Sequence, residues 1–258
     1  MAEKRKIHKG GQCLRYEPKD MKEITEDRAV MEAFRNAGCL QFCEKLQGCH
    51  MQVSKEFALN FNGIDTKVGM LNLSITPEVI AVATEIPRGQ ETWFKGFKFN
   101  MEKCKEFMKP EHTEMDLNNV VRRSCIKDNY SKFLIIIQKY FTCEGRYHKV
   151  YSYHFKLLFH FTSKISLDLP FYLHKSLSKM VDKVQAKSKG SETSLFHHGL
   201  MKLLVLDEIQ RLGRDWSSFL FVSGFELDAL TPSKTLKTKK VPSPLAAEQS
   251  QPLVAKPK

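Results

Sequence analysis

The sequence lacks a long apolar segment and a secretory leader. Its longest uncharged apolar run is far shorter than the roughly 18 residues that cross a bilayer, and the charged residues Met1 to Lys6 are followed by no apolar stretch. Its seven cysteines are odd in number and irregularly spaced, unlike a disulfide framework. We therefore expect an intracellular protein in a reducing compartment, with no membrane partner.

Catalytic signatures are also missing. There is no phosphate-binding loop, dinucleotide fingerprint, nucleophile elbow or His-Glu-x-x-His motif. Carboxylates such as Asp207, Glu208 and Asp215 are plentiful, but no pattern selects the group that a metal-dependent nuclease needs. The sequence therefore predicts a protein that is not an enzyme and has no catalytic residue, cofactor or metal ligand.

The positive charge is unevenly distributed along the chain. Of the net charge of +12, residues 1–15 contribute +4 and residues 229–258 contribute +5. Only +3 remains for residues 16–228, so the body of the chain is nearly neutral. A basic groove across the whole fold is therefore disfavoured.

Large apolar side chains are concentrated between Asp128 and Phe161, which we expect to form the scaffold of the fold. With 42% hydrophobic residues the chain can bury a sizeable core. We predict a mainly α, multi-helix globular domain over residues 23–228, with a small β element at about residues 67–99. Residues 1–22 are expected to be a flexible basic tail, and residues 229–258 a disordered basic tail.

Capping residues predict several boundaries in the first half of the chain. Thr25 is expected to cap the first helix. Alternating apolar residues over 67–75 predict a strand, although Met70 breaks the alternation. Thr76 followed by Pro77 is the strongest helix start, because Thr is a favoured N-cap and Pro loses no hydrogen bond at the first helical position. That helix is expected to end at Ile86, before the next proline.

The second half is expected to be helical after an irregular stretch. Asp128 and Ser194 are the expected N-caps of two helices. The alternation of Tyr151, Tyr153 and Phe155 keeps a strand open as an alternative to helix. The predicted elements are a short helix with connecting loops over 101–127, helices over 129–142 and 149–162, a helix starting near Leu167, and a helix over 195–212.

One cluster has metal-ligand spacing. Cys39, Cys43, Cys49 and His50 include a Cys-x3-Cys pair, which fits the range for structural zinc. Cys39 and Cys43 also lie at i and i+4 on a predicted helix, where small buried side chains are expected. Buried free thiols are therefore the preferred interpretation.

Two segments have the residue types that contact nucleic acid. Trp93 is followed by alternating rings and cations, including Lys95 and Lys98, and bases stack on rings while phosphates bind lysines. An ordinary half-buried strand is the preferred interpretation of this segment. In the tail, a basic cluster is a candidate for nucleic-acid contact or nuclear import, and its lysines are Lys237, Lys239 and Lys240.

Several segments resemble a domain of uncharacterised plant proteins, the plant transposon protein domain, whose members are associated with retroelements and sometimes labelled envelope-like. The resemblance covers roughly residues 28–222. It implies a plant origin and a mobile-element ancestry, and it supplies no activity and no site residues. The segments that carry it are Val53 to Phe61, Ile75 to Ile80, Ile86-Pro87, Leu157 to Phe161, Leu167 to Leu173 and Leu195 to Leu200.

These features predict a non-enzymatic, mobile-element-derived plant protein that acts through protein or nucleic-acid contacts. One alternative is nucleic-acid binding by the basic tails and the segment 93–99. The other is a remnant of a metal-dependent transposase or nuclease. Within the cell, we expect a nuclear location. No oligomeric state is predicted.

Overall fold

A computed structural model describes residues 26–46, 48, 50–90, 101–112, 120–143, 147–163, 166–186 and 197–227. This part of the chain is mainly helical, with two separate two-stranded sheets, which confirms the predicted fold class. The helices are α2 (Arg28–Asn36), α3 (Leu40–Lys45), α4 (Met51–Asn60), α5 (Pro77–Thr84), η2 (Met101–Phe107), η3 (Pro110–His112), η4 (Arg123–Cys125), α6 (Asp128–Ile136), η5 (Ile137–Phe141), α7 (Ser152–Ser163), α8 (Leu169–Ala186), α9 (His198–Arg211) and α10 (Trp216–Val222). The strands are β1 (Asp65–Val68), β2 (Leu71–Ser74), β3 (Val120–Arg122) and β4 (Lys149–Tyr151).

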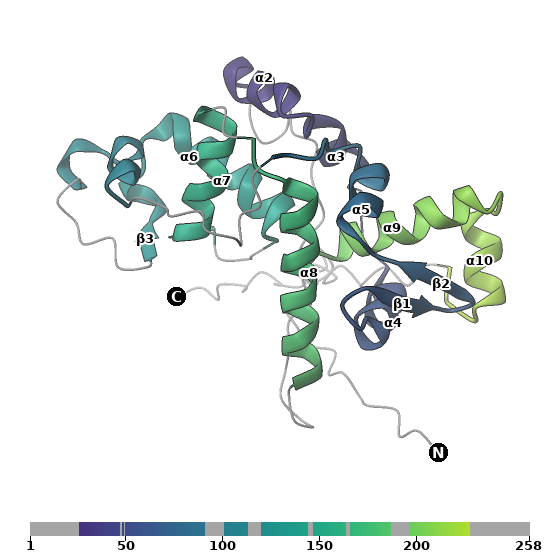
Figure 1. Ribbon diagram of the computed structural model, residues 1–258. Coiled ribbons are helices and arrows are strands. Elements are labelled where there is room, and N and C mark those ends of the chain that lie inside the picture. The colour runs from purple at the N-terminus through teal and green to yellow at the C-terminus, as the bar shows by residue number, and fades with distance from the viewer. Residues whose placement is uncertain are drawn as a thin grey trace, which may run out of the picture.

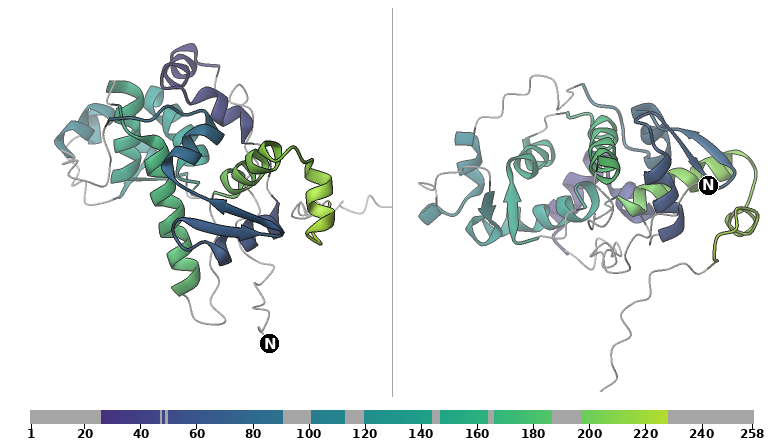
Figure 2. Two further views of the ribbon diagram at one scale, coloured as in Figure 1. Left: turned by 45° about the vertical axis from the view of Figure 1, so that its right-hand side comes forward. Right: turned by 90° about the horizontal axis from the view of Figure 1, so that it is seen from below.

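The long helix α8 lies between two groups of elements (Figures 1 and 2). One group contains α6, α7 and the β3–β4 sheet. The other contains α4, the β1–β2 hairpin, α9 and α10. The two sheets therefore lie at opposite ends of the molecule.

The stretch from Asp128 to Phe161 is the scaffold, as predicted. Phe34 of α2 stacks on Phe161 at 4.2 Å between ring centroids and lies 5.8 Å from Phe133. Phe141 joins them at 5.4 Å from Phe161. All four rings are buried, so α2, α6, η5 and α7 share one aromatic core.

The predicted strand over 67–75 is a hairpin. Met70 breaks the alternation because it lies in the two-residue turn between β1 and β2, after Gly69. Gly69 has φ +54°, and a Cβ there would lie 2.2 Å from Ser223 Oγ. A glycine at the first turn position suits a two-residue hairpin, and here it also lets the turn pack against the end of α10.

The helix start at Thr76 is confirmed. Thr76 Oγ1 accepts a hydrogen bond from the Val79 amide at 3.3 Å, and Pro77 is the first helical residue. The predicted end at Ile86 is wrong by two residues, because Glu85 adopts the left-handed conformation with φ 57° after Thr84.

Three other boundary predictions need correction. The N-cap of α2 is Asp27, which accepts from the Ala29 amide at 3.1 Å, and not Thr25. Asp128 is the first helical residue of α6, and the N-cap position belongs to Lys127. The last long helix begins at His198 after His197, so Ser194 is not its N-cap.

The predicted β structure was confined to about residues 67–99, but strands also form outside that range. The stretch 101–127 contains β3 as well as 3₁₀ turns, and the predicted helix over 149–162 begins as β4 before α7 starts at Ser152. Both interpretations of that segment were therefore right over part of its length. The predicted helix over 129–142 changes at Ile137 to the π-helical turn η5.

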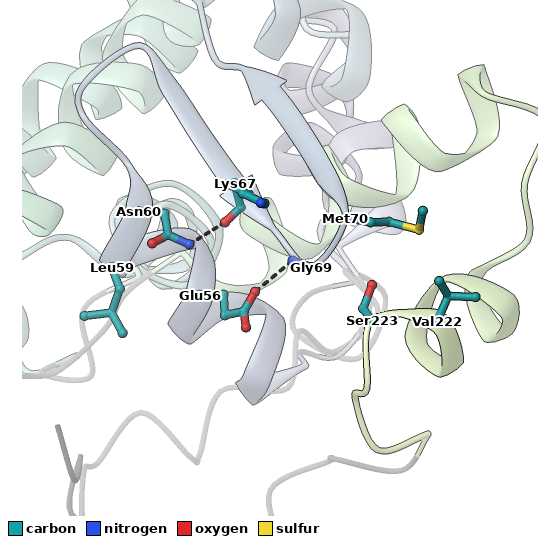
Figure 3. A pocket seen from close by; sticks show the side chains of 8 residues that line it. All are labelled: Glu56, Leu59, Asn60, Lys67, Gly69, Met70, Val222 and Ser223. Atoms are coloured by element: carbon teal, nitrogen blue, oxygen red, sulfur yellow. Dashed lines mark hydrogen bonds between the residues drawn. The ribbon is translucent and has the colours of Figure 1, made fainter. Parts of the chain in front are cut away.

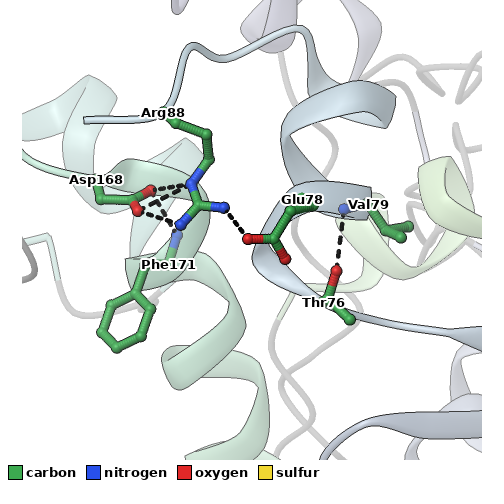
Figure 4. A network of polar contacts seen from close by, with 6 residues as sticks. All are labelled: Thr76, Glu78, Val79, Arg88, Asp168 and Phe171. Carbon is green, nitrogen blue, oxygen red and sulfur yellow. Dashed lines mark hydrogen bonds and ion pairs between the residues drawn. The ribbon is translucent and has the colours of Figure 1, made fainter. Parts of the chain in front are cut away.

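The start of α8 is fixed by a polar network (Figure 4). Asp168 is almost fully buried and accepts from the Phe171 amide at 3.1 Å, which caps the helix. Arg88 donates to its carboxylate from Nε at 2.9 Å and from Nη2 at 2.6 Å, and also binds Glu78 of α5. This network ties the first turn of α5 and the segment that follows α5 to the start of α8.

Candidate nucleic-acid interface

The sequence-predicted contact residues lie outside the described part of the chain. This applies to every one of them, namely Trp93, Lys95, Lys98, Lys237, Lys239 and Lys240. They stay predictions. The described residues contain a second surface with the same combination of residue types, on the β3–β4 sheet.

The outer face of this sheet pairs two cations. β3 and β4 are antiparallel, with Arg122 directly opposite Lys149. The Arg123 amide donates to the His148 carbonyl at 2.9 Å, so the adjacent Arg122–Lys149 pair is a non-hydrogen-bonded one. Side chains are closest at such pairs, and like charges directly opposite each other are destabilising.

The opposite face of the sheet is apolar and buried. Val121 is 2% exposed and Val150 is 0% exposed. Because side chains alternate along a strand, this fixes Arg122 and Lys149 on the outside. The next pair along the same face is Val120 and Tyr151. Val120 is 43% exposed, and Tyr151 is partly buried.

The outer edge of β4 is closed by the central scaffold. Gln138 in the π-helical turn η5 is fully buried and donates from Nε2 to the Lys149 carbonyl at 2.6 Å. The Tyr151 amide donates to His154 Nδ1 at 3.0 Å. The backbone of β4 is thus anchored on both sides of Val150, and its outward side chains have a defined position.

Two partly buried tyrosine rings lie beyond the cations, and the buried ring of His154 packs behind them. Tyr151 and Tyr153 are stacked, with centroids 5.4 Å apart and planes at 6°. His154 lies edge-on to Tyr153 at 4.4 Å. Since His154 Nδ1 accepts a hydrogen bond, its Nε2 carries the proton and donates to Thr142 Oγ1 at 3.2 Å.

Burial keeps His154 neutral. Its side chain is 0% exposed, and desolvation lowers its pKa from 6.5 to about 3. Protonation of Nδ1 would remove the acceptor of the Tyr151 amide. The neutral ring therefore holds both tyrosines in place at ordinary pH.

The surrounding segments carry positive charge without acids. Residues 120–127 and 147–151 include five basic or imidazole side chains and no Asp or Glu, namely Arg122, Arg123, Lys127, His148 and Lys149. Within the described ranges, Arg122, Arg123 and Lys149 form no ion pair. Lys127 Nζ donates to the Glu106 carbonyl at 2.7 Å, and nearby Lys109 binds Asp128 at 3.3 Å.

Sequence reasoning missed this surface because its two strands are far apart in the chain. The alternation over Lys149, Tyr151 and Tyr153 was visible, but the three residues of β3 are too few to give a periodic signal. No local pattern shows that Arg122 will pair with Lys149. Only the folded structure brings these two residues together.

The structure gives His50 a different role from that of a metal ligand. His50 Nδ1 accepts from the Val53 amide at 3.3 Å, capping α4, and Nε2 lies 2.9 Å from the Glu226 carbonyl. Cys39 and Cys43 are buried, and desolvation raises the pKa of both thiols. Cys49 lies outside the described residues. Among the residues that the structure describes, no group of three His, Cys, Asp or Glu side chains could hold a metal ion.

A Ser–His pair with a partly buried serine and a buried histidine links α8 to the N-cap of α9. Ser176 Oγ is 2.8 Å from His197 Nε2. Burial, with a contribution from His198, lowers the pKa of His197 to about 4. In the described part of the chain, His197 Nδ1 has no hydrogen-bond partner, so the pair lacks the third group that orients the imidazole in a catalytic triad.

A hollow of about 630 Å³ lies between α4, the hairpin turn and α10 (Figure 3). Two of its polar side chains bind the hairpin backbone. Glu56 Oε2 accepts from the Gly69 amide at 2.8 Å, and Asn60 Nδ2 donates to the Lys67 carbonyl at 2.7 Å. Both contacts hold the hairpin backbone. The rest of the lining mixes the apolar side chains of Leu59, Met70 and Val222 with the polar side chains of Lys67 and Ser223.

No protein-family model, curated protein or solved structure matches the chain. In the described part of the chain, no helix combines the length and apolar character needed to cross a membrane. The functional assignment therefore depends on the geometry of the candidate interface.

Proposed function

We propose that this protein is a non-enzymatic nucleic-acid-binding protein whose binding surface is the outer face of β3 and β4. The observation that carries the proposal is the direct opposition of Arg122 and Lys149. A fold gains nothing from two cations at a narrow cross-strand pair, because they repel each other. A phosphate group between them would be bound by both and would relieve that repulsion.

The neighbouring side chains favour nucleic acid over an acidic protein surface. A carboxylate-rich partner would need only the cations. Tyr151 lies on the same face, two positions along β4 from Lys149, and stacks on Tyr153. Rings next to cations are the combination by which proteins hold bases and phosphates together.

The basic tails support the same proposal. The +4 of residues 1–15 and the +5 of residues 229–258 would add sequence-independent attraction to phosphates. A mobile-element ancestry in plants and a nuclear location belong to this proposal as well. They are supported by the resemblance in sequence and by the basic clusters, respectively.

The salt dependence of binding tests the proposal. Fluorescence anisotropy with a labelled oligothymidylate, measured over a series of salt concentrations, gives the slope of log affinity against log salt. Each phosphate contact with a single strand contributes a slope of about 0.7. The double variant Arg122→Gln/Lys149→Gln loses the one phosphate that both cations would bind and should therefore lower the slope by about 0.7.

Lys67→Gln is the matched control, because Lys67 is an exposed strand lysine on β1 opposite the uncharged Asn72. We expect it to leave the slope within the error of the wild-type value. An unchanged slope in the double variant, or no binding by the wild type, would contradict the proposal. Equal displacement of the oligonucleotide by polyglutamate would also contradict it and indicate an acidic protein partner.

A further inference from the structure

We infer that the ligand of the β3–β4 face is single-stranded nucleic acid, bound by stacking of a base on Tyr151. This inference rests on the proposed nucleic-acid binding and adds the class of strand and the residue that selects it.

Tyr151 and Lys149 point to the same side of β4, two residues apart. That separation is roughly 7 Å along a strand. A phosphate between Arg122 and Lys149 would therefore have the base of a neighbouring nucleotide within reach of the Tyr151 ring. One short strand thus provides both a backbone contact and a base contact.

The ring of Tyr151 is held in position before any ligand arrives. Its amide is bound to His154 Nδ1 at 3.0 Å, and one face of its ring is stacked against Tyr153 with planes at 6°. His154 is itself fixed by Thr142 at 3.2 Å. A ring that is already ordered loses little conformational freedom on binding, which favours affinity.

The sheet is poorly suited to a duplex. β3 has three residues and β4 has three residues, and the cations and the ring lie on one short face. Bases in a duplex are stacked on each other and present only their edges in the grooves. A single strand can splay a base onto an aromatic ring, which is how single strands are commonly recognised.

Three probes of equal length test the inference with the full chain: oligothymidylate, an abasic oligonucleotide with the same number of phosphates, and a duplex. The wild type should bind oligothymidylate about tenfold or more tightly than the abasic strand, since stacking of one base contributes that much. Tyr151→Ala should remove this difference, and Tyr151→Phe should keep it. His154→Ala tests positioning, because it removes the acceptor of the Tyr151 amide, and it should weaken binding of oligothymidylate more than binding of the abasic strand.

The outcomes separate the inference from the proposed function. Equal binding of all three probes by the wild type would overturn base stacking while the nucleic-acid proposal stands. Absence of binding to every probe would overturn both. If Tyr151→Ala is unfolded by circular dichroism, Tyr151→Leu replaces it and keeps apolar bulk without a ring. An undiminished preference for oligothymidylate in a folded variant without the ring would overturn the inference.

Discussion

Arg122 of β3 and Lys149 of β4 are opposed cations at a non-hydrogen-bonded position of an antiparallel pair. The strand that carries Lys149 is anchored by Gln138 and His154, both buried in the scaffold. The scaffold and the candidate interface are therefore one unit. Residues that form the core also determine the position of the charged pair.

A charge reversal at this pair should affect stability and binding in opposite directions. Lys149→Glu replaces cross-strand repulsion with an Arg122–Glu attraction and should raise the free energy of unfolding by about 0.2–1 kcal/mol. The same change should weaken oligonucleotide binding. Urea unfolding and fluorescence anisotropy on one sample measure both, with Lys67→Glu as the control. A fall in both stability and affinity would indicate that binding is lost through misfolding.

The cap of α5 should contribute measurably to stability. Thr76→Ala removes the acceptor of the Val79 amide and should lower the free energy of unfolding by about 1 kcal/mol. Thr76→Ser keeps the hydroxyl and should cost much less. Urea unfolding of both variants provides the comparison, and equal losses would show that the hydroxyl does not cap the helix.

Arg88 should matter more to stability than Glu78, although both belong to one network. Asp168 is 2% exposed and depends on Arg88 as its cationic partner in the described structure. Arg88→Ala would leave that carboxylate buried without this partner and should cost about 2–3 kcal/mol. Glu78 is exposed, and although Arg88 lowers its pKa to about 2, solvent screens the pair. Glu78→Ala should therefore cause a much smaller loss of stability. Thermal unfolding of the two variants measures both losses, and an equal or larger loss in Glu78→Ala would contradict the prediction.

Acid should destabilise the protein through His154. The pKa of His154 is lowered from 6.5 to about 3 in the folded state, so the unfolded chain takes up the proton first as pH falls. The stability that the neutral ring contributes is fully present above pH 6.5. It is lost as pH falls from about 6.5 to about 3, up to a total on the order of 5 kcal/mol.

The variant His154→Asn isolates this contribution. Asn can still accept from the Tyr151 amide but does not titrate. The difference in stability between neutral pH and about pH 4 should be smaller in the variant than in the wild type. His197, whose pKa is also lowered by burial, is present in both proteins and cancels in the comparison. Identical pH dependence would contradict the assignment.

Local signals in the sequence predicted the elements that local chemistry determines. The Thr76–Pro77 helix start and the apolar scaffold between Asp128 and Phe161 were both found in this way. Boundaries failed where tertiary contacts decide. Glu85, which ends α5 early in a left-handed conformation, binds Lys45 of α3. Asp27, which caps α2, also binds Lys132 of α6 at 3.1 Å.

The candidate interface could not be predicted because it depends on long-range pairing. Lys149 and Tyr151 were visible as part of an alternating segment, but β3 lies in a stretch with no clear period. Gln138 reaches Lys149 from within the π-helical turn η5, which no residue pattern in the sequence announces. The aromatic and basic residues selected instead, from Trp93 to Lys98, stay a prediction.

Photocrosslinking tests the location of binding most directly. A single-stranded oligonucleotide containing 5-iodouracil, irradiated in complex with the full-length protein, marks the aromatic side chain on which its base stacks, and mass spectrometry identifies the modified peptide. The β3–β4 assignment predicts adducts on Tyr151 or Tyr153 that disappear in Arg122→Gln/Lys149→Gln. Adducts confined to residues 91–100 or to the tails, with none on either tyrosine, would contradict it.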